Sequence, residues 1–226
     1  MSSPRSRLLS AAWLVAAACA PKAVSRPPAP DVAAPDTPDT GPRALAVLDA
    51  LEADIAAERA DRADRKRAYE TVAALPDDAS AAYAFARAAL AGRLAEARGA
   101  KAGRLVGEAE AWALRAIERD PGFRDGAATR LLGSLYVLAP PRLLAHGDSE
   151  KGLAMLEGLV RDHPDDPRAH LRLAEAYVAL GDPEAALPAL CVAHAEAKAL
   201  PGDERRLLDR LVEDVGGPDM LDCQTP

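Results

Sequence analysis

Four histidines and three cysteines are the residues best suited to metal or nucleophilic chemistry. Cys191 and His194 lie three positions apart on an expected helix, so both side chains could face one metal ion. A zinc site needs at least a third protein ligand, and the sequence places none nearby. The remaining histidines, His146, His163 and His170, belong to no HExxH motif, so we expect surface or packing roles for all four.

Motifs of the common enzyme classes are missing from the sequence. It contains no P-loop, no GxSxG and no GxGxxG. The acidic stretch 162–166 lacks the glycine and the bidentate glutamate of a calcium loop, which favours an inter-helix turn with capping acids. We therefore expect a protein that is not an enzyme, with no catalytic residue, metal ligand or cofactor.

Composition narrows the fold class. The 226 residues carry 28 Lys+Arg against 35 Asp+Glu, a net charge of -7, which argues against binding to nucleic acid. Hydrophobic residues make up 49% but aromatic residues only 4%, so the apolar content is mostly alanine and leucine. Both are strong helix formers, and an all-α fold is predicted.

The N-terminal segment has the pattern of an export signal. Arg5 and Arg7 precede the apolar run 8–15, which is too short to span a bilayer. Bases, a short apolar run and small residues predict a secretory signal peptide over residues 1–18.

Small residues lead directly to the first cysteine. Ala16-Ala17-Ala18 followed by Cys19 resembles a bacterial lipobox, and that resemblance implies a lipid anchor on Cys19. A leucine is usual at position 16, so ordinary cleavage after Ala18 or Ala20 is the alternative. Position 20 is not Asp, as in Gram-negative lipoproteins that are sorted to the outer membrane. This resemblance implies that the protein is anchored at the periplasmic face of the outer membrane.

The rest of the chain divides by composition into three parts. Residues 19–42 comprise the expected lipidated cysteine and a stretch rich in proline. This composition predicts an extended, disordered tether. Residues 43–214 form the expected helical repeat domain, and residues 215–226 a flexible tail.

Small residues recur with a period of 34. Gly147 and Gly181 are separated by 34 positions, as are Gly152 and Ala186. This is the period of the tetratricopeptide (TPR) helical hairpin, in which small residues allow close helix packing. Further repeat positions are Ala109, Ala116, Gly133, Pro164 and Tyr177.

The repeats predict an irregular TPR-like α-solenoid of antiparallel hairpins, closed by a C-terminal capping helix. Seven extra residues between Tyr136 and Gly147 break its register. Asp78, Asp148 and Asp182 are expected helix caps. The expected helices are 43–75 (one helix or two), 79–98, 104–119, 126–138, 148–162, 167–180, 183–198 and 202–214.

One segment is more specific than a generic repeat. The stretches 126–140 and 147–151, with Ala174-Glu175-Ala176-Tyr177, resemble the T component (TatT) of TPR-associated TRAP transporters. Members of that family are periplasmic lipoproteins built of helical hairpins. The resemblance implies a helper that docks a periplasmic solute-binding protein and holds or passes on a small ligand.

The resemblance also implies candidate binding residues. The planar fork of Arg130 could meet a carboxylate of a ligand or partner, and the alternative is an internal ion pair with an acid such as Asp148. Tyr136 is either a ligand contact or, as we favour, groove packing. Arg142 and His146 lie within residues 137–146, which contain the seven extra residues and which we call the extra segment. This segment is either a loop that faces a partner or a packed cover.

A peptide-binding groove is the second possibility for this fold. It would present exposed polar side chains on the first helices of the hairpins, such as His170 and Arg172. Function is thus expected to be either a TatT-like scaffold or a general TPR adaptor for protein assembly in the cell envelope. The sequence is also compatible with a homo-oligomer.

Two cysteines remain after any lipidation. In an oxidising envelope Cys191 and Cys223 could pair and fix the C-terminal tail. Because spacing alone does not bring them together, we favour Cys191 as a core residue and Cys223 as a free thiol.

Overall fold

The computed structural model describes residues 39–221 and Cys223. This part of the chain contains nine α-helices, four short 3₁₀ helices and no β-strand. The α-helices are α1 (Thr40–Ala56), α2 (Arg62–Ala73), α3 (Ala81–Glu96), α4 (Gly103–Arg119), α5 (Ala127–Leu138), α6 (Ser149–Asp162), α7 (Pro167–Ala179), α8 (Pro183–Ala195) and α9 (Gly202–Asp214). The 3₁₀ helices are η1 (Gly99–Lys101), η2 (Pro141–Leu143), η3 (Ala197–Ala199) and η4 (Pro218–Met220).

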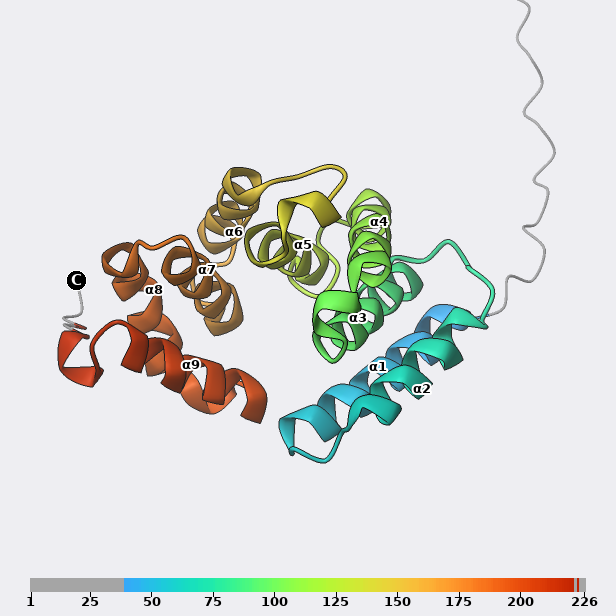
Figure 1. The fold of residues 1–226 in the computed structure, drawn as a ribbon, viewed down its shortest axis with the longest axis horizontal. Coiled ribbons are helices and arrows are strands. Elements are labelled where there is room, and N and C mark those ends of the chain that lie inside the picture. The colour runs from blue at the N-terminus through green and yellow to red at the C-terminus, as the bar shows by residue number, and fades with distance from the viewer. Residues whose placement is uncertain (1–38, 222, 224–226) are drawn as a thin grey trace, which may run out of the picture. The chain divides into compact units, whose positions relative to one another are not determined.

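Three helical hairpins form the centre of the stack. Helix α3 packs on α4, α5 on α6, and α7 on α8, and each hairpin contacts the next one along the chain (Figure 1). The first helices also touch one another, α3 with α5 and α5 with α7. This arrangement confirms the predicted all-α solenoid of hairpins.

Alanine and glycine permit the close packing inside these hairpins. Ala88 of α3 and Ala109 and Ala113 of α4 are fully buried. At the α5–α6 contact, a Cβ on Gly152 would lie 2.7 Å from the carbonyl oxygen of Gly133, too close for any side chain. Leucines then fill the space between hairpins, and each fully buried leucine contributes about 1.5–3 kcal/mol.

The expected helix 43–75 is two helices. The chain turns between α1 and α2, where Glu58 adopts a positive φ of 58°. The side chain of Asp61 then caps α2 by accepting hydrogen bonds from the backbone N–H groups of Ala63 and Asp64. The side chain of Asp64 in turn accepts the backbone N–H of Asp61, which completes a capping box. Helix α1 begins at Thr40, before the expected boundary at residue 43.

Two of the three expected caps are found, and the third differs. Asp148 caps α6 and Asp182 caps α8. Ser80, not Asp78, caps α3, because its hydroxyl accepts the backbone N–H of Tyr83 at 3.1 Å. Asp78 instead accepts the hydroxyl of Ser80 at 2.6 Å and the backbone N–H of Gly41 at 2.6 Å, which ties α1 to α3.

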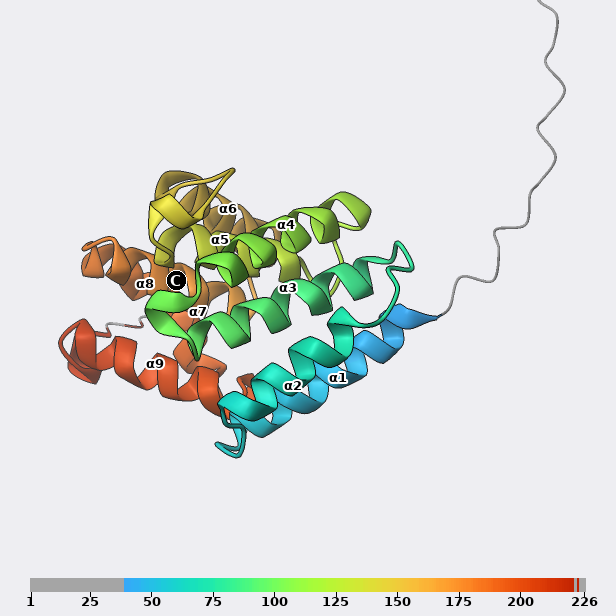
Figure 2. The same cartoon turned by 45° about the vertical axis from the view of Figure 1, so that its right-hand side comes forward.

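The first and last helices meet. Helix α9 packs on α7 and α8, as expected of a capping helix, and also contacts α1 (Figures 1 and 2). Arg206 of α9 donates to the carbonyl oxygens of Ile55 and Ala56 at 3.4 Å. A Cβ on Gly202 would overlap the carbonyl oxygen of Ala56, so only glycine permits this approach.

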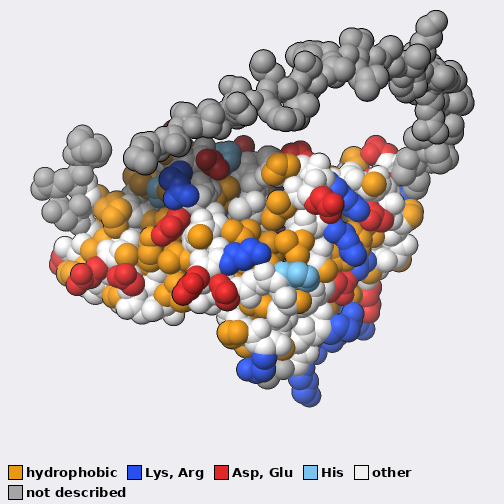
Figure 3. Space-filling view, turned by 90° about the horizontal axis from the view of Figure 1, so that it is seen from above, with side chains coloured by type: hydrophobic (Ala, Val, Ile, Leu, Met, Phe, Trp, Pro, Cys, Tyr) orange, Lys and Arg blue, Asp and Glu red, His pale blue; other side chains and the backbone are white. Residues whose placement is uncertain are grey.

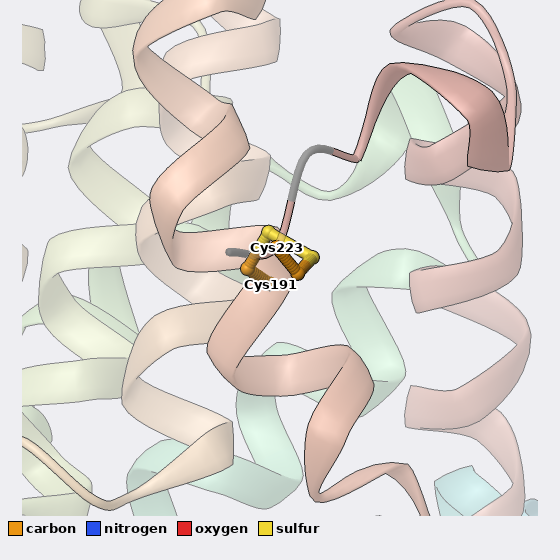
Figure 4. The surroundings of a disulfide bond; sticks show 2 residues. All are labelled: Cys191 and Cys223. Atoms are coloured by element: carbon orange, nitrogen blue, oxygen red, sulfur yellow. A yellow bond between two sulfur atoms is a disulfide. The ribbon is translucent and has the colours of Figure 1, made fainter. Parts of the chain in front are cut away.

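Cys191 and Cys223 form a disulfide, which makes our preference for a core cysteine and a free thiol wrong (Figure 4). Their Cα atoms lie 5.3 Å apart. Within the expected C-terminal tail, Gly216 and Gly217 form a turn that is followed by η4, and Cys223 is bonded to α8. Local turn geometry brings the cysteines together, and sequence spacing carries no information about it.

The predicted signal peptide over residues 1–18, the predicted lipid anchor on Cys19 and most of the predicted tether lie outside the described residues. Within the described range, no helix combines the length and apolar character needed to cross a membrane.

Candidate partner-binding site

Four arginines on the first helices of the hairpins form one charged surface, which we call the arginine face. It consists of Arg93 of α3, Arg130 of α5, and Arg168 and Arg172 of α7. Arg168 and Arg172 are four residues apart and therefore lie on the same side of α7. The acids that contact these arginines come from α1, α3, α7, α9 and the turn before α7.

Arg93 joins both ends of the stack. Its guanidinium binds Glu52 of α1 at 2.6 Å and Asp203 of α9 at 3.2 Å. Burial lowers the pKa of Arg93, but the hydrogen bond and charge of Glu52, with Glu96 and Asp203, outweigh it and raise the pKa above its ordinary value. Three carboxylates, those of Glu52, Glu96 and Asp203, therefore contact this arginine.

Glu204 of α9 lies between two arginines of α7. Its carboxylate is 3.1 Å from Nε of Arg168 and 3.4 Å from Arg172, and the residue is only 9% exposed. Arg172 also binds Glu175 at 2.8 Å. A carboxylate this buried is stable only because the guanidinium groups compensate for its lost hydration.

Arg130 has fewer acidic contacts. Its guanidinium pairs with Asp166 at 3.0 Å, so its internal partner is Asp166 and not the expected Asp148, which caps α6. Burial lowers the pKa of Arg130. The positive charges of Arg168 and Arg172 act in the same direction, against the opposing charges of Asp166 and Glu204.

Arg130 and Arg168 line a pocket of about 340 Å³. The pocket is lined by Phe85, Arg124, Asp125, Ala127, Arg130, Asp166 and Arg168. Its wall includes Arg124 and Asp125, whose φ angles of 48° and 55° are unusual for residues with a side chain. Such backbone conformations cost roughly 1–3 kcal/mol each and are found preferentially at binding sites.

His170 differs from the expected exposed groove residue. It is 8% exposed, and its Nε2 lies 2.7 Å from the carbonyl oxygen of Pro164. His170 therefore links α7 to the turn that precedes it. Arg172, the other expected groove residue, is half-buried and paired with acids on the arginine face.

Tyr136 lies at a second location, beside the extra segment. It is 1% exposed, its ring fills the space above Gly147, and Nζ of Lys151 lies 5.4 Å from the ring centre. Burial, and then the negative charge of the nearby Glu110, raise the pKa of Tyr136 to about 12. These surroundings indicate a packing role for Tyr136.

Glu110 holds the extra segment and was missed in the sequence. This α4 residue is 1% exposed, and its carboxylate accepts the backbone N–H groups of Ala145 at 2.8 Å and His146 at 2.7 Å. Arg142 and His146 are exposed, and Nδ1 of His146 lies 3.5 Å from the carboxylate of Glu110. The only available signal was an acid directly after the buried position Ala109.

The predicted binding residues therefore do not converge on one site. Arg130 lines the pocket, Tyr136 of α5 lies beside the extra segment that contains His146, and His170 of α7 contacts the turn before its helix. On the face seen in Figure 3, hydrophobic side chains are interspersed with acidic and basic ones. No cluster of three or more His, Cys, Asp or Glu side chains suited to a metal ion occurs among residues 39–221 and Cys223.

The repeat positions are largely buried contacts between helices. Ala109, Ala116 and Ala186 are fully buried, and the hydroxyl of Tyr177 bonds Glu157 of α6 at 2.8 Å. Gly181 adopts a φ of 84° at the end of α7. Pro164 lies in the turn between α6 and α7.

Comparison with known families agrees with this geometry. The tetratricopeptide repeat family matches residues 141–204, which span η2, α6, α7, α8 and the start of α9. Residues 141–204 are therefore similar to tetratricopeptide repeats. A search of curated proteins found no match. TPR segments are typical of scaffolds for protein–protein interaction, and this segment contains Arg168, Arg172 and Glu204 of the arginine face.

Proposed function

We propose that the chain is a non-enzymatic TPR scaffold, tethered to the cell envelope, that binds a periplasmic protein through the arginine face and its pocket. One observation carries this proposal. Side chains from three successive hairpins, Phe85, Arg130 and Arg168, line a single pocket, so the stack presents a surface that no hairpin could form alone.

The envelope location rests on the N-terminal sequence and is supported by the disulfide. The predicted signal and Cys19 form a lipoprotein pattern. Disulfides persist in oxidising compartments such as the periplasm, and Cys191–Cys223 is consistent with export.

For the partner, we propose a TRAP-type solute-binding protein, with a small ligand held by the scaffold. The TatT-like stretch 126–140 supports this choice, because it supplies Ala127 and Arg130 to the pocket. A general adaptor for envelope assembly is the second candidate, and it is favoured by the match of residues 141–204 to ordinary TPR repeats.

Site-specific photocrosslinking in cells that make the full-length chain tests the proposal. A photoreactive amino acid replaces Phe85 in the pocket, and the control replaces the exposed Ala154 of α6. We expect a crosslinked periplasmic partner from position 85 and none from position 154. Crosslinks from position 154 alone would contradict the proposed binding face.

The identity of the crosslinked protein separates the two candidates. Mass spectrometry that identifies a TRAP-type solute-binding protein supports the transporter role. Outer-membrane or envelope assembly factors would support the general adaptor instead. Palmitate labelling that Cys19→Ala abolishes would support the lipid anchor.

A further inference from the structure

Every arginine that lines the pocket already has an acid as its partner. The three ion pairs are Arg124–Asp49 at 2.8 Å, Arg130–Asp166 at 3.0 Å and Arg168–Glu204 at 3.1 Å. Glu204 also contacts Arg172, which has Glu175 as a second acid. The positive charges of the pocket are therefore matched from within the chain.

Asp125 is the charged residue of the pocket that lacks such a partner. It lines the pocket and is exposed, and its carboxylate forms neither an ion pair nor a hydrogen bond within the described range 39–221. The adjacent Arg124 does not neutralise it, because both ends of that guanidinium bind Asp49 at 2.8 Å. Asp125 thus adds one unmatched negative charge, which favours the entry of a cation.

An unusual turn positions Asp125. Residues 124, 125 and 126 all have positive φ angles, of 48°, 55° and 70°. Gly126 packs so closely on α6 that a Cβ there would lie 2.5 Å from Cδ1 of Leu159. Aspartate tolerates the left-handed conformation better than most residues that have a side chain. The turn therefore holds a carboxylate at the wall of the pocket.

Phe85 of α3 supplies an aromatic surface in the same pocket. The residue is only partly buried, and its ring centre lies 5.8 Å from that of Phe123. The face of an aromatic ring attracts a cation. The side chain of an arginine or a lysine also has an apolar stem, which could cover Phe85 and Ala127 while the charged end meets Asp125. A volume of about 340 Å³ accommodates one such side chain.

We propose that the pocket binds a cationic side chain, an arginine or a lysine of the protein partner, with its charge on Asp125 and its stem on Phe85. This inference rests on the proposed scaffold function and names the chemistry of the segment that the scaffold binds. Asp125 is the main contact, because Asp166 and Glu204 are occupied by arginines of the chain itself.

A peptide titration of the full chain tests the inference. The probe is the peptide Ser-Leu-Arg-Arg-Leu-Ser, and its control has both arginines replaced by citrulline, which has nearly the same shape and no charge. Backbone amide shifts of the ¹⁵N-labelled protein, followed by NMR, give the affinity and the location of binding. The variants are Asp125→Asn and Phe85→Leu. Asp209→Asn is the matched control for Asp125→Asn, because it removes the same charge from an exposed position of α9. Circular dichroism checks that each variant is folded.

We expect the arginine peptide to shift the amides of residues 124–127 and to bind about tenfold or more tightly than the citrulline peptide, as is typical of charge-assisted hydrogen bonds. Asp125→Asn should reduce its affinity to that of the citrulline peptide, and Asp209→Asn should leave it unchanged. Phe85→Leu should weaken binding about twofold to fivefold, because the ring no longer faces the cation.

Other results would overturn the inference. Equal binding of the two peptides, no binding of either, or an unchanged affinity in Asp125→Asn would each show that the pocket does not select cations. Equal losses in Asp125→Asn and Asp209→Asn would reveal a general attraction to an acidic protein instead of a site. An unchanged affinity in Phe85→Leu would contradict the contact with the ring.

The crosslinking experiment separates this inference from the scaffold function. If the peptides failed but position 85 still captured a partner, the scaffold function would stand without this chemistry. Binding that selects arginine, without a crosslinked partner, would support the site and contradict the scaffold function.

Discussion

The phenol ring of Tyr136 leaves no room for a side chain at residue 147. A Cβ on Gly147 would overlap three atoms of that ring. Gly181, its equivalent in the 34-residue period, has open space around it but a φ of 84°. Glycine is thus required at both positions for different reasons, packing at 147 and backbone conformation at 181.

Gly147→Ala should destabilise the protein by about 1–3 kcal/mol, because the ring of Tyr136 must move within a packed site. Gly107→Ala is the control: it lies inside α4 with open space around it and should stabilise the helix by about 1 kcal/mol. Urea denaturation measures both. An unchanged free energy of unfolding in Gly147→Ala would mean that the extra segment shifts freely.

Glu110→Ala should release the extra segment, since the backbone N–H groups of Ala145 and His146 lose their shared acceptor. A cost of about 2–4 kcal/mol is expected from the loss of charge-assisted hydrogen bonds. Amide hydrogen exchange at Ala145 and His146, followed by NMR, should become much faster. Glu118→Ala, at an exposed position of the same helix, should leave both amides protected.

The pKa of Tyr136 predicts a loss of stability at alkaline pH. Its folded-state value of about 12 lies above the ordinary 10.0, so the folded protein keeps a proton that the unfolded chain releases. The stabilisation is complete below pH 10 and is lost as the pH rises towards 12, with a magnitude on the order of 1–2 kcal/mol. The free energy of unfolding of Tyr136→Phe should fall less steeply over this range. If the free energy of unfolding fell equally steeply with pH in both proteins, the raised pKa of Tyr136 would be contradicted.

At the scale of elements, the sequence predicted the helices from α3 onward closely. Small residues with a 34-residue period and acidic caps such as Asp148 and Asp182 are local signals. The sequence does not decide whether residues 43–75 form one helix or two, because no glycine or proline marks the break between α1 and α2. Asp61 and Asp64 form a capping box at that break.

The charged run 58–70 shows why side-chain partners were harder to predict. Within this run Lys66 and Glu70 are four positions apart on α2, and they do pair, at 3.5 Å. Glu58, however, pairs with Arg206 of α9, and Arg65 pairs with Glu96 of α3, so these two partners lie on other helices. Arg130 illustrates the same limit in the candidate site, because packing of α5 on α7 selects Asp166 over Asp148.

The disulfide attaches the C-terminal tail to α8 and encloses α9 in a loop of 32 residues. Cys191→Ser/Cys223→Ser should therefore lower the free energy of unfolding by about 2–4 kcal/mol, mainly through the entropy of the unfolded chain. Urea denaturation with and without reductant measures the effect. The wild type should lose stability on reduction, whereas the double variant should not respond; a response of the double variant would point to another cause.

At the scale of the whole helical domain, Gly202 controls the contact between the two ends. Gly202→Ala should push the start of α9 away from the carbonyl of Ala56. Spin labels introduced through unnatural amino acids at the exposed positions Ala53 and Asp209 would report a longer, broader distance distribution. The control Ala195→Gly changes an exposed residue of α8 and should leave that distribution unchanged. An unchanged distribution in Gly202→Ala would show that the end contact is not set by this close approach.

The meeting of α1 and α9 has a consequence for how the domain folds. A linear repeat array can nucleate anywhere and fray from either end, because each repeat touches only its neighbours. The bond from Arg206 to Ile55 joins residues 151 positions apart, so it forms only after the intervening hairpins have docked. Such a contact suppresses fraying at both ends, makes unfolding more cooperative, and slows the last step of folding relative to an open array.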